Sequence, residues 1–356
     1  MPDFIVQKAP GRICLFGDHQ DFLGLPVIAG TIDRHIHLKA QTNDSSALTI
    51  ALPDLGTSRT ISLREELSEL QPRDYFRSGL RVLQKAGIHV DQGYRIEISG
   101  DIPLQAGLSS SSALVVVWLR FLLEATQQLD RTTPEQLAQW AYQTEVLEFD
   151  EPGGLMDQYT IALGGLVHLD TRSGKHLRLS SDLGSLIVVD SGIPKETLEI
   201  LTRSKTYALE AIARVQKQDP SFAIEQATER DFKQWSSLMT PEILPYWEAG
   251  IYNHLITQKA LKALQEPLLD LPHIGKLMAA HQKFLSQNIQ NTPQPIQKQM
   301  TLAMKMGAWG AKIVGSGGGG CYVIIAPEKL HLELISAISD FGVKEIFTTT
   351  ITPSHA

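Results

Sequence analysis

Apolar and polar residues alternate along several short stretches in the first half of the chain. In residues 94–99 the apolar positions are Tyr94, Ile96 and Ile98, a period of two that is typical of a half-buried strand. Further strands are expected at residues 4–8, 36–40, 48–52, 166–169, 176–179 and 186–190. The first half should therefore contain a β-sheet.

Longer stretches predict helices. Residues 110–128 carry a long apolar run, and a second helix should begin at Thr133-Pro134, where threonine can cap the first amides and proline needs no donor. That helix should end near residue 147. From residue 195 onward the pattern becomes amphipathic, with helices expected at 194–216, 221–238, 252–264, 274–287 and 293–307. A Gly-rich loop, a strand at 321–326, a helix at 328–340 and a strand at 344–350 should complete the chain.

This succession of elements predicts an α+β fold with two domains, residues 1–185 and 186–356. The chain has 356 residues, of which 43% are hydrophobic and 20% charged, as in ordinary globular proteins with two cores. We expect the two domains to share a large interface with a cleft between them.

Charge and composition exclude several classes of protein. The net charge of −7 gives no basic field that would attract nucleic acid or an anionic membrane. The most apolar helical stretch, 114–123, contains Arg120 and is too short to span a bilayer, and the N-terminus does not resemble a signal peptide. Cys14 and Cys321 fit no zinc or redox spacing, which favours a reducing cytoplasm.

A Ser-rich loop joins the strand at 94–99 to the long apolar helix. Residues 100–113 read Gly-Asp-Ile-Pro-Leu-Gln-Ala-Gly-Leu-Ser-Ser-Ser-Ser-Ala. The first amides of a helix lack intrahelical partners and bind phosphate oxygens, and serine hydroxyls can donate to phosphate or coordinate magnesium. A plain helix cap is the alternative interpretation, because serine is a preferred capping residue. Four consecutive serines exceed what a cap needs, so the loop favours an anion site.

A second loop, residues 312–321, has five glycines among the six positions 315–320. Gly315, Gly317 and Gly320 formally match a dinucleotide-binding fingerprint, but a strand follows them instead of a helix, which excludes a nicotinamide site. A flexible turn is one interpretation. The ordered apolar segments on both sides favour a backbone that must pack close to something.

A third segment, residues 9–24, combines Arg12 with Asp18, His19 and Asp21 on what we expect to be a tight loop. A permanent cation beside such a cluster suits recognition of a polyhydroxylated or anionic small molecule, although a solvated polar turn has the same composition.

Acidic residues also gather between positions 145 and 157. Glu145 and Glu148 share one face of the second helix, and most of these acids fit a solvated surface. Asp157 differs, because it lies among Gly, Leu and Met in Gly153-Gly154-Leu155-Met156-Asp157. A carboxyl group in that setting is a candidate base or metal ligand.

Taken together and in this order, these segments resemble the motifs of the GHMP kinases, which include galactokinase, homoserine kinase, mevalonate kinase and phosphomevalonate kinase. Residues 9–33 are similar to the galactokinase signature, 103–113 to the phosphate-binding loop, and 312–321 to the C-terminal Gly-rich motif. Gly154-Leu155-Met156-Asp157-Gln158 is similar to the galactokinase stretch with the catalytic aspartate. The resemblance implies an N-terminal domain like ribosomal protein S5 domain 2 and a ferredoxin-like C-terminal domain.

The resemblance also implies roles for individual residues, with ATP and Mg²⁺ bound. Asp157 would be the catalytic base and Arg12 the cation near the transferred phosphoryl group. Ser111 and Glu145 would bind magnesium. ATP would contact Gly107, Leu108, Ser109, Ser110, Ser111, Ser112, Gly317 and Gly318. Asp18, His19 and Asp21, and more weakly Asp190, would hold sugar hydroxyls.

Some positions depart from the family pattern. Gln105 replaces a usual glycine and Ser112 a common alanine, while Asp18 replaces glutamate and Gln20 threonine. Residues 24–29 and 31–33 look like mevalonate kinase. These changes leave kinase activity expected and concern the identity of the acceptor.

The sequence therefore predicts a cytoplasmic kinase, monomeric or homodimeric, that phosphorylates a small sugar, at the anomeric hydroxyl of galactose or a close relative. One alternative is a mevalonate kinase, but Asp21 would repel the carboxylate of mevalonate. The other is a sugar sensor without catalysis, which Gln105 keeps open although Ser111, Glu145 and Asp157 are all present.

Overall fold

The computed structural model describes residues 3–180, 182–195 and 197–353. Its larger sheet has seven strands, in which β1 lies along one edge of β2 while β5 and β6 share the other edge. The strands are β1 (Phe4–Phe16), β2 (Val27–Thr42), β3 (Ala47–Leu52), β4 (Thr57–Ser62), β5 (Tyr94–Gly100), β6 (Leu166–Leu169) and β7 (His176–Leu179). Neighbours are antiparallel except for β3 and β5, which are parallel.

β1 is much longer than the strand that we expected at residues 4–8. It continues through Arg12 to Phe16, and from Ala9 onward every residue is buried. The pairing with β2 shifts register between Pro10 and Arg12 and again between Cys14 and Phe16. The expectation of a loop over residues 9–24 was therefore wrong as far as Phe16, because this apolar segment satisfies its backbone by pairing with β2.

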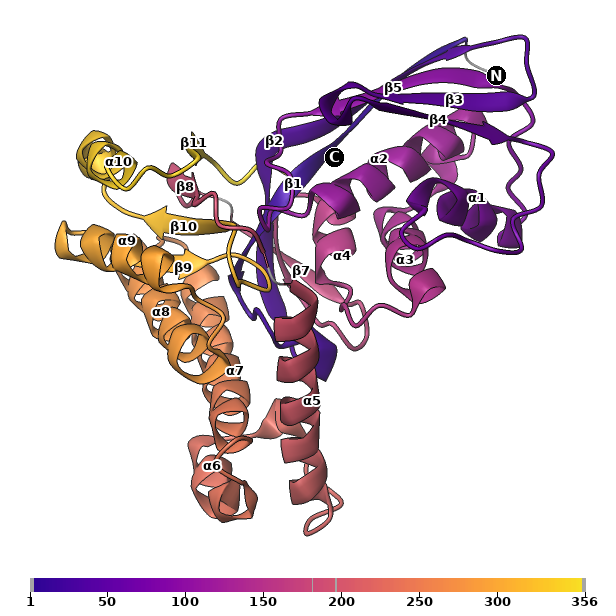
Figure 1. Ribbon diagram of the computed structural model, residues 1–356. Helices are drawn as coiled ribbons and strands as arrows, with labels where there is room; N and C mark the ends of the chain where they lie inside the picture. Colours follow the sequence, from indigo (N-terminus) through magenta and orange to yellow (C-terminus); the bar gives the residue numbers. More distant parts are fainter. Residues whose placement is uncertain (1–2, 181, 196, 354–356) are drawn as a thin grey trace.

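Four helices pack beside the larger sheet (Figure 1): α1 (Tyr75–Lys85), α2 (Ser110–Ala125), α3 (Pro134–Glu145) and α4 (Met156–Leu163). α2 is apolar on nearly every side, and its Trp118 and Phe121 are fully buried. A helix that is apolar all round must be enclosed, and α2 accordingly lies between the sheet and the other helices. Its N-terminus is thereby fixed at one end of the sheet.

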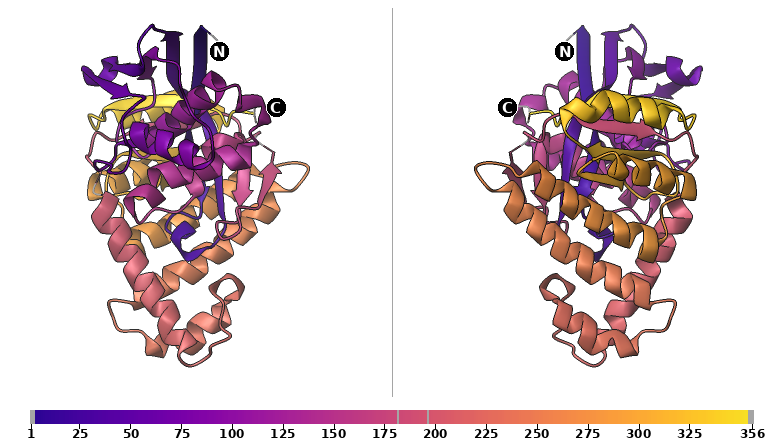
Figure 2. Two further views of the ribbon diagram at one scale, coloured as in Figure 1. Left: turned by 90° about the vertical axis from the view of Figure 1, so that its right-hand side faces the viewer. Right: turned by 90° about the vertical axis from the view of Figure 1, so that its left-hand side faces the viewer.

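The second half of the chain forms a four-stranded antiparallel sheet in the order β11-β8-β10-β9. The strands are β8 (Leu186–Asp190), β9 (Gly310–Ile313), β10 (Cys321–Ile325) and β11 (Glu345–Thr349). The helices are α5 (Thr197–Gln216), α6 (Glu229–Trp235), α7 (Leu244–Leu264), α8 (Leu271–Phe284), α9 (Gln294–Lys305) and α10 (His331–Ser339). Figure 2 shows α5, α6 and α7 extending away from the end of the molecule at which the N-terminus lies.

The two halves share one hydrophobic core. Buried residues of β8 and β10, such as Val188 and Val323, belong to the same cluster as Ile13 of β1 and Leu108. Ile351, after β11, returns to form a bridge with Ile32 of β2. The chain changes sheet between β7 and β8, near the boundary predicted at residue 185, while the shared core joins the halves into one body.

The α+β expectation is confirmed, but four short elements were not predicted: β4, α1, α4 and β9. The helix expected at 221–238 is also shorter, since only α6 is regular within it. Within the described residues, no helix combines the length and the apolar character needed to cross a membrane.

Candidate active site

Arg12 and Asp157 form a two-pronged ion pair at the centre of the molecule. The Arg12 Nε atom donates to Asp157 Oδ1 at 2.7 Å, and Nη2 donates to Oδ2 at 2.8 Å. The third nitrogen, Nη1, donates to the carbonyl oxygen of Gly107 at 2.6 Å. Burial alone would raise the pKa of Asp157, but the Arg12 charge and its hydrogen bonds hold that pKa below its ordinary value. At neutral pH the pair is fully charged.

The Ser-rich loop brings the start of α2 to this ion pair. Ser109, the residue before α2, has a left-handed backbone with φ of 59°, and its hydroxyl donates to Asp157 Oδ2 at 2.5 Å. No side chain caps the first turn of α2. The first amides of this helix are therefore available to an anion, as the serine run suggested.

The predicted magnesium ligands also lie together. Glu145 is the last residue of α3, is 7% exposed, and accepts a hydrogen bond from Gln158 Nε2 at 2.7 Å. The nearby Ser112 and Ser111 hydroxyls favour its charged form. Burial raises the pKa of this carboxyl group above its usual value, and a cation would offset that cost. A carboxylate and a hydroxyl suit magnesium. The described residues hold no group of three or more His, Cys, Asp or Glu side chains that could bind a metal.

The C-terminal Gly-rich loop packs directly on the phosphate loop. The Cys321 amide donates to the Ala106 carbonyl oxygen at 2.6 Å. A Cβ atom at Gly107 would lie 2.8 Å from the Val314 carbonyl oxygen, and one at Gly320 would lie 2.5 Å from that of Ala106. Neither contact is possible for a side chain, so glycine is required where these two loops meet. Gly317 and Gly318 lie in the same loop, and Gly318 donates to the Asn291 carbonyl oxygen.

Gln105 has a left-handed backbone, with φ of 54°. This conformation explains why glycine is usual at the position.

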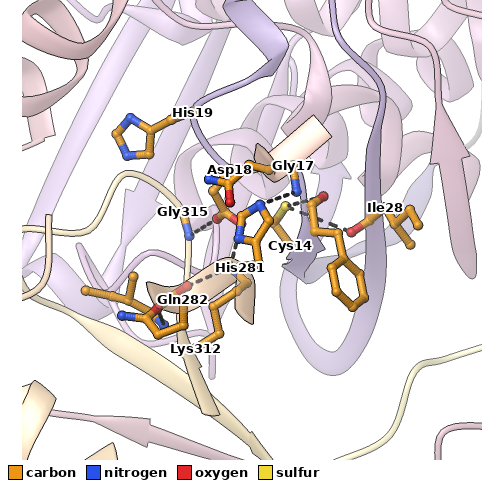
Figure 3. Close-up of polar contacts among 12 residues, drawn as sticks. Cys14, Gly17, Asp18, His19, Ile28, His281, Gln282, Lys312 and Gly315 are labelled. Carbon is orange, nitrogen blue, oxygen red and sulfur yellow. Dashed lines mark hydrogen bonds and ion pairs between the residues drawn. The ribbon is translucent and has the colours of Figure 1, made fainter. Parts of the chain in front are cut away.

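Asp18 is bound within the protein (Figure 3). Its Oδ2 atom pairs with the ammonium group of Lys312, and its Oδ1 atom accepts the Gly315 amide at 2.8 Å. Asp18 and Lys312 are both buried, at 1% and 0% side-chain exposure. Burial would raise the pKa of Asp18, but the Lys312 charge lowers it overall. We therefore assign Asp18 to the contact between the two halves, and no longer to the sugar site, because both oxygens already have strong partners.

Around this pair, a buried polar cluster joins the two halves. His281 of α8 accepts the Gly17 amide through Nε2 at 3.1 Å, and the Cys14 thiol donates to the Phe16 carbonyl oxygen at 3.2 Å. His19 points away from this cluster (Figure 3) and reaches the Gly-rich loop, with its Nε2 atom 2.9 Å from the Ser316 carbonyl oxygen.

Asp21 and Asp190 have different surroundings. Asp21 lies against Gly154, where a Cβ atom would collide with its carboxylate, and burial together with the Asp157 charge raises its pKa to about 6. Asp190, at the end of β8, accepts the Gly192 amide at 3.0 Å and lies 3.2 Å from the Lys344 ammonium group. We therefore keep Asp21 as a candidate acceptor-site residue and assign Asp190 to its local turn.

Sequence reasoning missed three residues at this centre: Lys312, Asn291 and Lys195. A lysine inside the buried strand β9 could have been recognised as a candidate for pairing. Asn291 follows a π-turn, Leu285–Ile289, and contacts both His19 and the Gly-rich loop. Lys195 follows Pro194 in a connecting segment, and no pattern around it indicates a site.

The chain matches two family models and one signature. The model for the GHMP kinases N terminal domain matches residues 74–165, and that for the GHMP kinases C terminal domain matches residues 260–344. The galactokinase galactose-binding signature matches residues 2–42.

Relatives extend over most of the chain. A galactokinase from Lacticaseibacillus casei is 28% identical over 333 residues, covering 89% of this chain and 84% of its own. A mevalonate kinase from Thermococcus sibiricus is 26% identical over 360 residues, covering 97% and 95%. In fold, Lactococcus lactis galactokinase complexed with galactose matches with a TM-score of 0.88 at 21% identity over 99% of this chain and 94% of that one. Methanococcus jannaschii mevalonate kinase matches with a TM-score of 0.74 at 19% identity, over 98% of each chain. The chain belongs to the GHMP kinase family and is a galactokinase-like kinase that carries the galactose-binding signature.

Proposed function

We propose that this kinase transfers the γ-phosphoryl group of ATP to the anomeric hydroxyl of galactose or a closely related sugar, with Mg²⁺ as the metal. Membership of the family implies the use of ATP. The observation that carries the proposal is the set of contacts among Arg12, Asp157 and Ser109 at the open end of α2. It puts a fixed cation, a carboxylate and helix amides within one small region.

Phosphoryl transfer depends mainly on positioning and on charge neutralisation, and each residue of this region would have a separate role in it. The amides and hydroxyls of 107–112 would hold the phosphates, with Gly317 and Gly318 closing the site from the other loop. Magnesium, held by Ser111 and Glu145, would neutralise negative charge on them. Arg12 would stabilise charge on the phosphoryl group in transfer.

Asp157 would orient the acceptor hydroxyl and take its proton. Because Arg12 and Ser109 both bond to it, its carboxylate is held in one orientation and is a weak base in the resting enzyme. Orientation is therefore its larger contribution, and proton transfer would come late, as the oxygen begins to bond to phosphorus.

Asp21 would contact the sugar, whereas His19, whose Nε2 atom lies 2.9 Å from the Ser316 carbonyl oxygen, would hold the turn beside it. Asp21 lies near Asp157 and is partly exposed, so it can accept hydrogen bonds from sugar hydroxyls. His19 is buried and its pKa is lowered to about 4, chiefly by burial, so it would act as a neutral group.

A mevalonate kinase is the second candidate. The likeness to mevalonate kinases over nearly the whole chain favours it, and so does the engagement of Asp18 by Lys312, which removes one acid from the acceptor site. Asp21 still opposes a carboxylate substrate.

The test is to incubate the pure protein with ATP, Mg²⁺ and, separately, galactose, other hexoses and mevalonate. Mass spectrometry should detect a hexose phosphate. This product should no longer act as a reducing sugar, because a phosphate on the anomeric hydroxyl blocks ring opening. Phosphorylated mevalonate as the sole product would contradict the sugar assignment, and an absence of product with every acceptor would favour the sensor.

Asp157→Asn should lower kcat by roughly 10²–10⁴-fold while ATP still binds, because an amide cannot accept the proton. Steady-state kinetics and calorimetric ATP titration measure the two effects. Asp44→Asn, an exposed acid in a loop, is the matched control and should leave kcat unchanged. An unaltered kcat for Asp157→Asn would remove this residue from the mechanism.

A further inference from the structure

Lys195 reaches across the two glycine loops from the segment between β8 and α5. A Cβ atom built on Gly107 would lie 3.4 Å from its Nζ atom, and one built on Gly315 would lie 3.7 Å from it. The lysine stem passes Gly320, where a Cβ atom would lie 3.1 Å from Cδ. The ammonium group therefore lies where the phosphate loop meets the C-terminal Gly-rich loop.

This ammonium group has no anion of its own. Among the described residues, no hydrogen bond or ion pair joins it to another side chain, whereas the nearby Arg12 is already paired with Asp157. Burial, and next the Arg12 charge, lower the pKa of Lys195 to about 8. The other groups that act on it are Asp157, Asp18 and Cys321, which raise its pKa. Two cations near one carboxylate leave an excess of positive charge that a phosphoryl group would balance.

We propose that Lys195 donates a hydrogen bond to the terminal phosphoryl group of ATP, opposite Arg12, and so serves as a second cation in the transfer. The proposal rests on the proposed phosphoryl transfer and goes beyond it by assigning this residue. A lysine from the segment between β8 and α5 that reaches both glycine loops would also make ATP draw these loops together.

Replacement of Lys195 tests the assignment. Lys195→Gln should lower kcat by about 100-fold, as the loss of one donor to a developing charge does elsewhere, with little change in KM for the sugar. Lys195→Arg should restore most of the loss. Calorimetry should show that Lys195→Gln weakens binding of a non-hydrolysable ATP analogue much more than binding of ADP. Lys217→Gln, at the exposed far end of α5, is the control.

The pH profile adds a readout that a structural role would not produce. In the wild type, kcat/KM for ATP should fall as the pH rises through about 8, and in Lys195→Arg this fall should move to higher pH. An effect of Lys195→Gln on acceptor KM alone, or equal losses for the ATP analogue and ADP, would overturn the assignment. The binding comparison needs no turnover, so it decides the role of Lys195 even if the sugar assignment fails.

A second, independent observation is a small cavity beside His19. It has a volume of about 10 Å³ and lies between the turn that carries His19 and Gln20, helix α5 and helix α7. Four buried polar atoms at this cavity have no hydrogen-bond partner: His19 Nδ1, Gln20 Nε2, Ser204 Oγ and Asn253 Oδ1. Such a volume is about the least that a cavity needs to hold one water molecule.

The four atoms match the hydrogen-bonding capacity of water. His19 Nε2 lies 2.9 Å from the Ser316 carbonyl oxygen, which can only accept, and 3.2 Å from Asn291 Nδ2. We assign the proton to Nε2 because the carbonyl oxygen is the nearer partner, and this leaves Nδ1 as an acceptor. Asn253 Oδ1 is a second acceptor. Gln20 Nε2 and the Ser204 hydroxyl are donors. We infer that one water fills the cavity, donating to His19 and Asn253 and accepting from Gln20 and Ser204, and so fixes the His19 turn to α5 and α7.

A crystal structure at about 1.5 Å or better should show one water with these four neighbours. Thermal unfolding measures the melting temperature of the variants. The double variant Ser204→Ala/Asn253→Ala should lower it by less than the two single variants do in sum, because both residues share one water. An empty cavity would overturn the inference, and so would additive losses. Anomalous scattering from a soaked rubidium ion in the cavity would overturn it as well, in favour of a cation.

Discussion

At the scale of single residues, the sequence predicted which side chains take part better than it predicted what they touch. Arg12 and Asp157 were singled out from their neighbours along the chain, and Glu145 from the resemblance to the family; all three lie at the candidate site. The partner of Asp18 could not be predicted, since Lys312 is 294 positions away. Lys195 was missed for the same reason, because its significance depends on loops far from it in sequence.

Asp21 provides a prediction at this scale. Its pKa is raised to about 6, so its carboxyl group keeps its proton more readily in the folded protein than in the unfolded chain. The contribution of Asp21 to stability should therefore fall as the pH rises from about 4 through 6 and then stay level. Asp21→Asn should remove this loss, on the order of 2 kcal/mol at pH 7, and the gain should vanish below pH 4.

Urea unfolding of both proteins between pH 4 and pH 8 measures this difference. If Asp21 also contacts the sugar, the stabilised variant should have a higher KM for its acceptor, a trade-off typical of active-site groups. A variant as stable as the wild type across the whole pH range would contradict the pKa shift.

At the scale of secondary-structure elements, strong periodicity predicted α2, α3 and most strands. Two of the missed elements show why a local pattern can fail. α1 carries Gly79 in its middle, where the Trp118 ring would lie 2.8 Å from a Cβ atom, so packing overrides helix propensity. β9 is the four-residue segment Gly-Ala-Lys-Ile, too short to show a period. β1 was underestimated because its second half is buried on both faces and does not alternate.

The close contact between the phosphate loop and the C-terminal Gly-rich loop leads to a prediction about ATP binding and stability. Gly320→Ala should separate the loops, because its Cβ atom would meet the Ala106 carbonyl oxygen at 2.5 Å, and both ATP affinity and stability should fall. Gly342→Ala is a matched control: Gly342 has φ of 69° against 74° for Gly320, but a Cβ atom there meets nothing within 4 Å. Backbone strain is thus common to both variants.

Calorimetric ATP titration and thermal unfolding of the two variants separate the collision from the strain. Gly320→Ala should bind ATP much more weakly than Gly342→Ala. Equal losses in both variants would mean that close packing of the loops contributes nothing to binding.

At the scale of the whole molecule, the halves are joined by a shared core, by the bridge between Ile32 and Ile351, and by the buried pair of Asp18 and Lys312. Two domains were predicted from the change in pattern near residue 185. How closely the two halves are joined could not be predicted, because a buried ion pair across an interface has no local signature in the sequence.

Lys312→Met should destabilise the protein by about 3–5 kcal/mol, because it leaves the Asp18 carboxylate buried without a counter-charge. Adding Asp18→Asn should recover part of this loss, since no uncompensated charge then remains. Denaturant unfolding of the two single variants and the double variant measures the coupling. Additive losses would show that the pair contributes no mutual stabilisation.

The two cysteines lie at the contacts between the halves, Cys321 against Ala106 and Cys14 beside Asp18, and both thiols are buried. Burial raises the pKa of each thiol, which further slows its chemistry. A reagent can therefore alkylate these thiols in the native enzyme only when the halves separate. The rate of alkylation then measures how often this opening occurs. Because the chain has only these 2 cysteines, mass spectrometry can follow the alkylation of each one separately. Saturating nucleotide should slow the alkylation of Cys321.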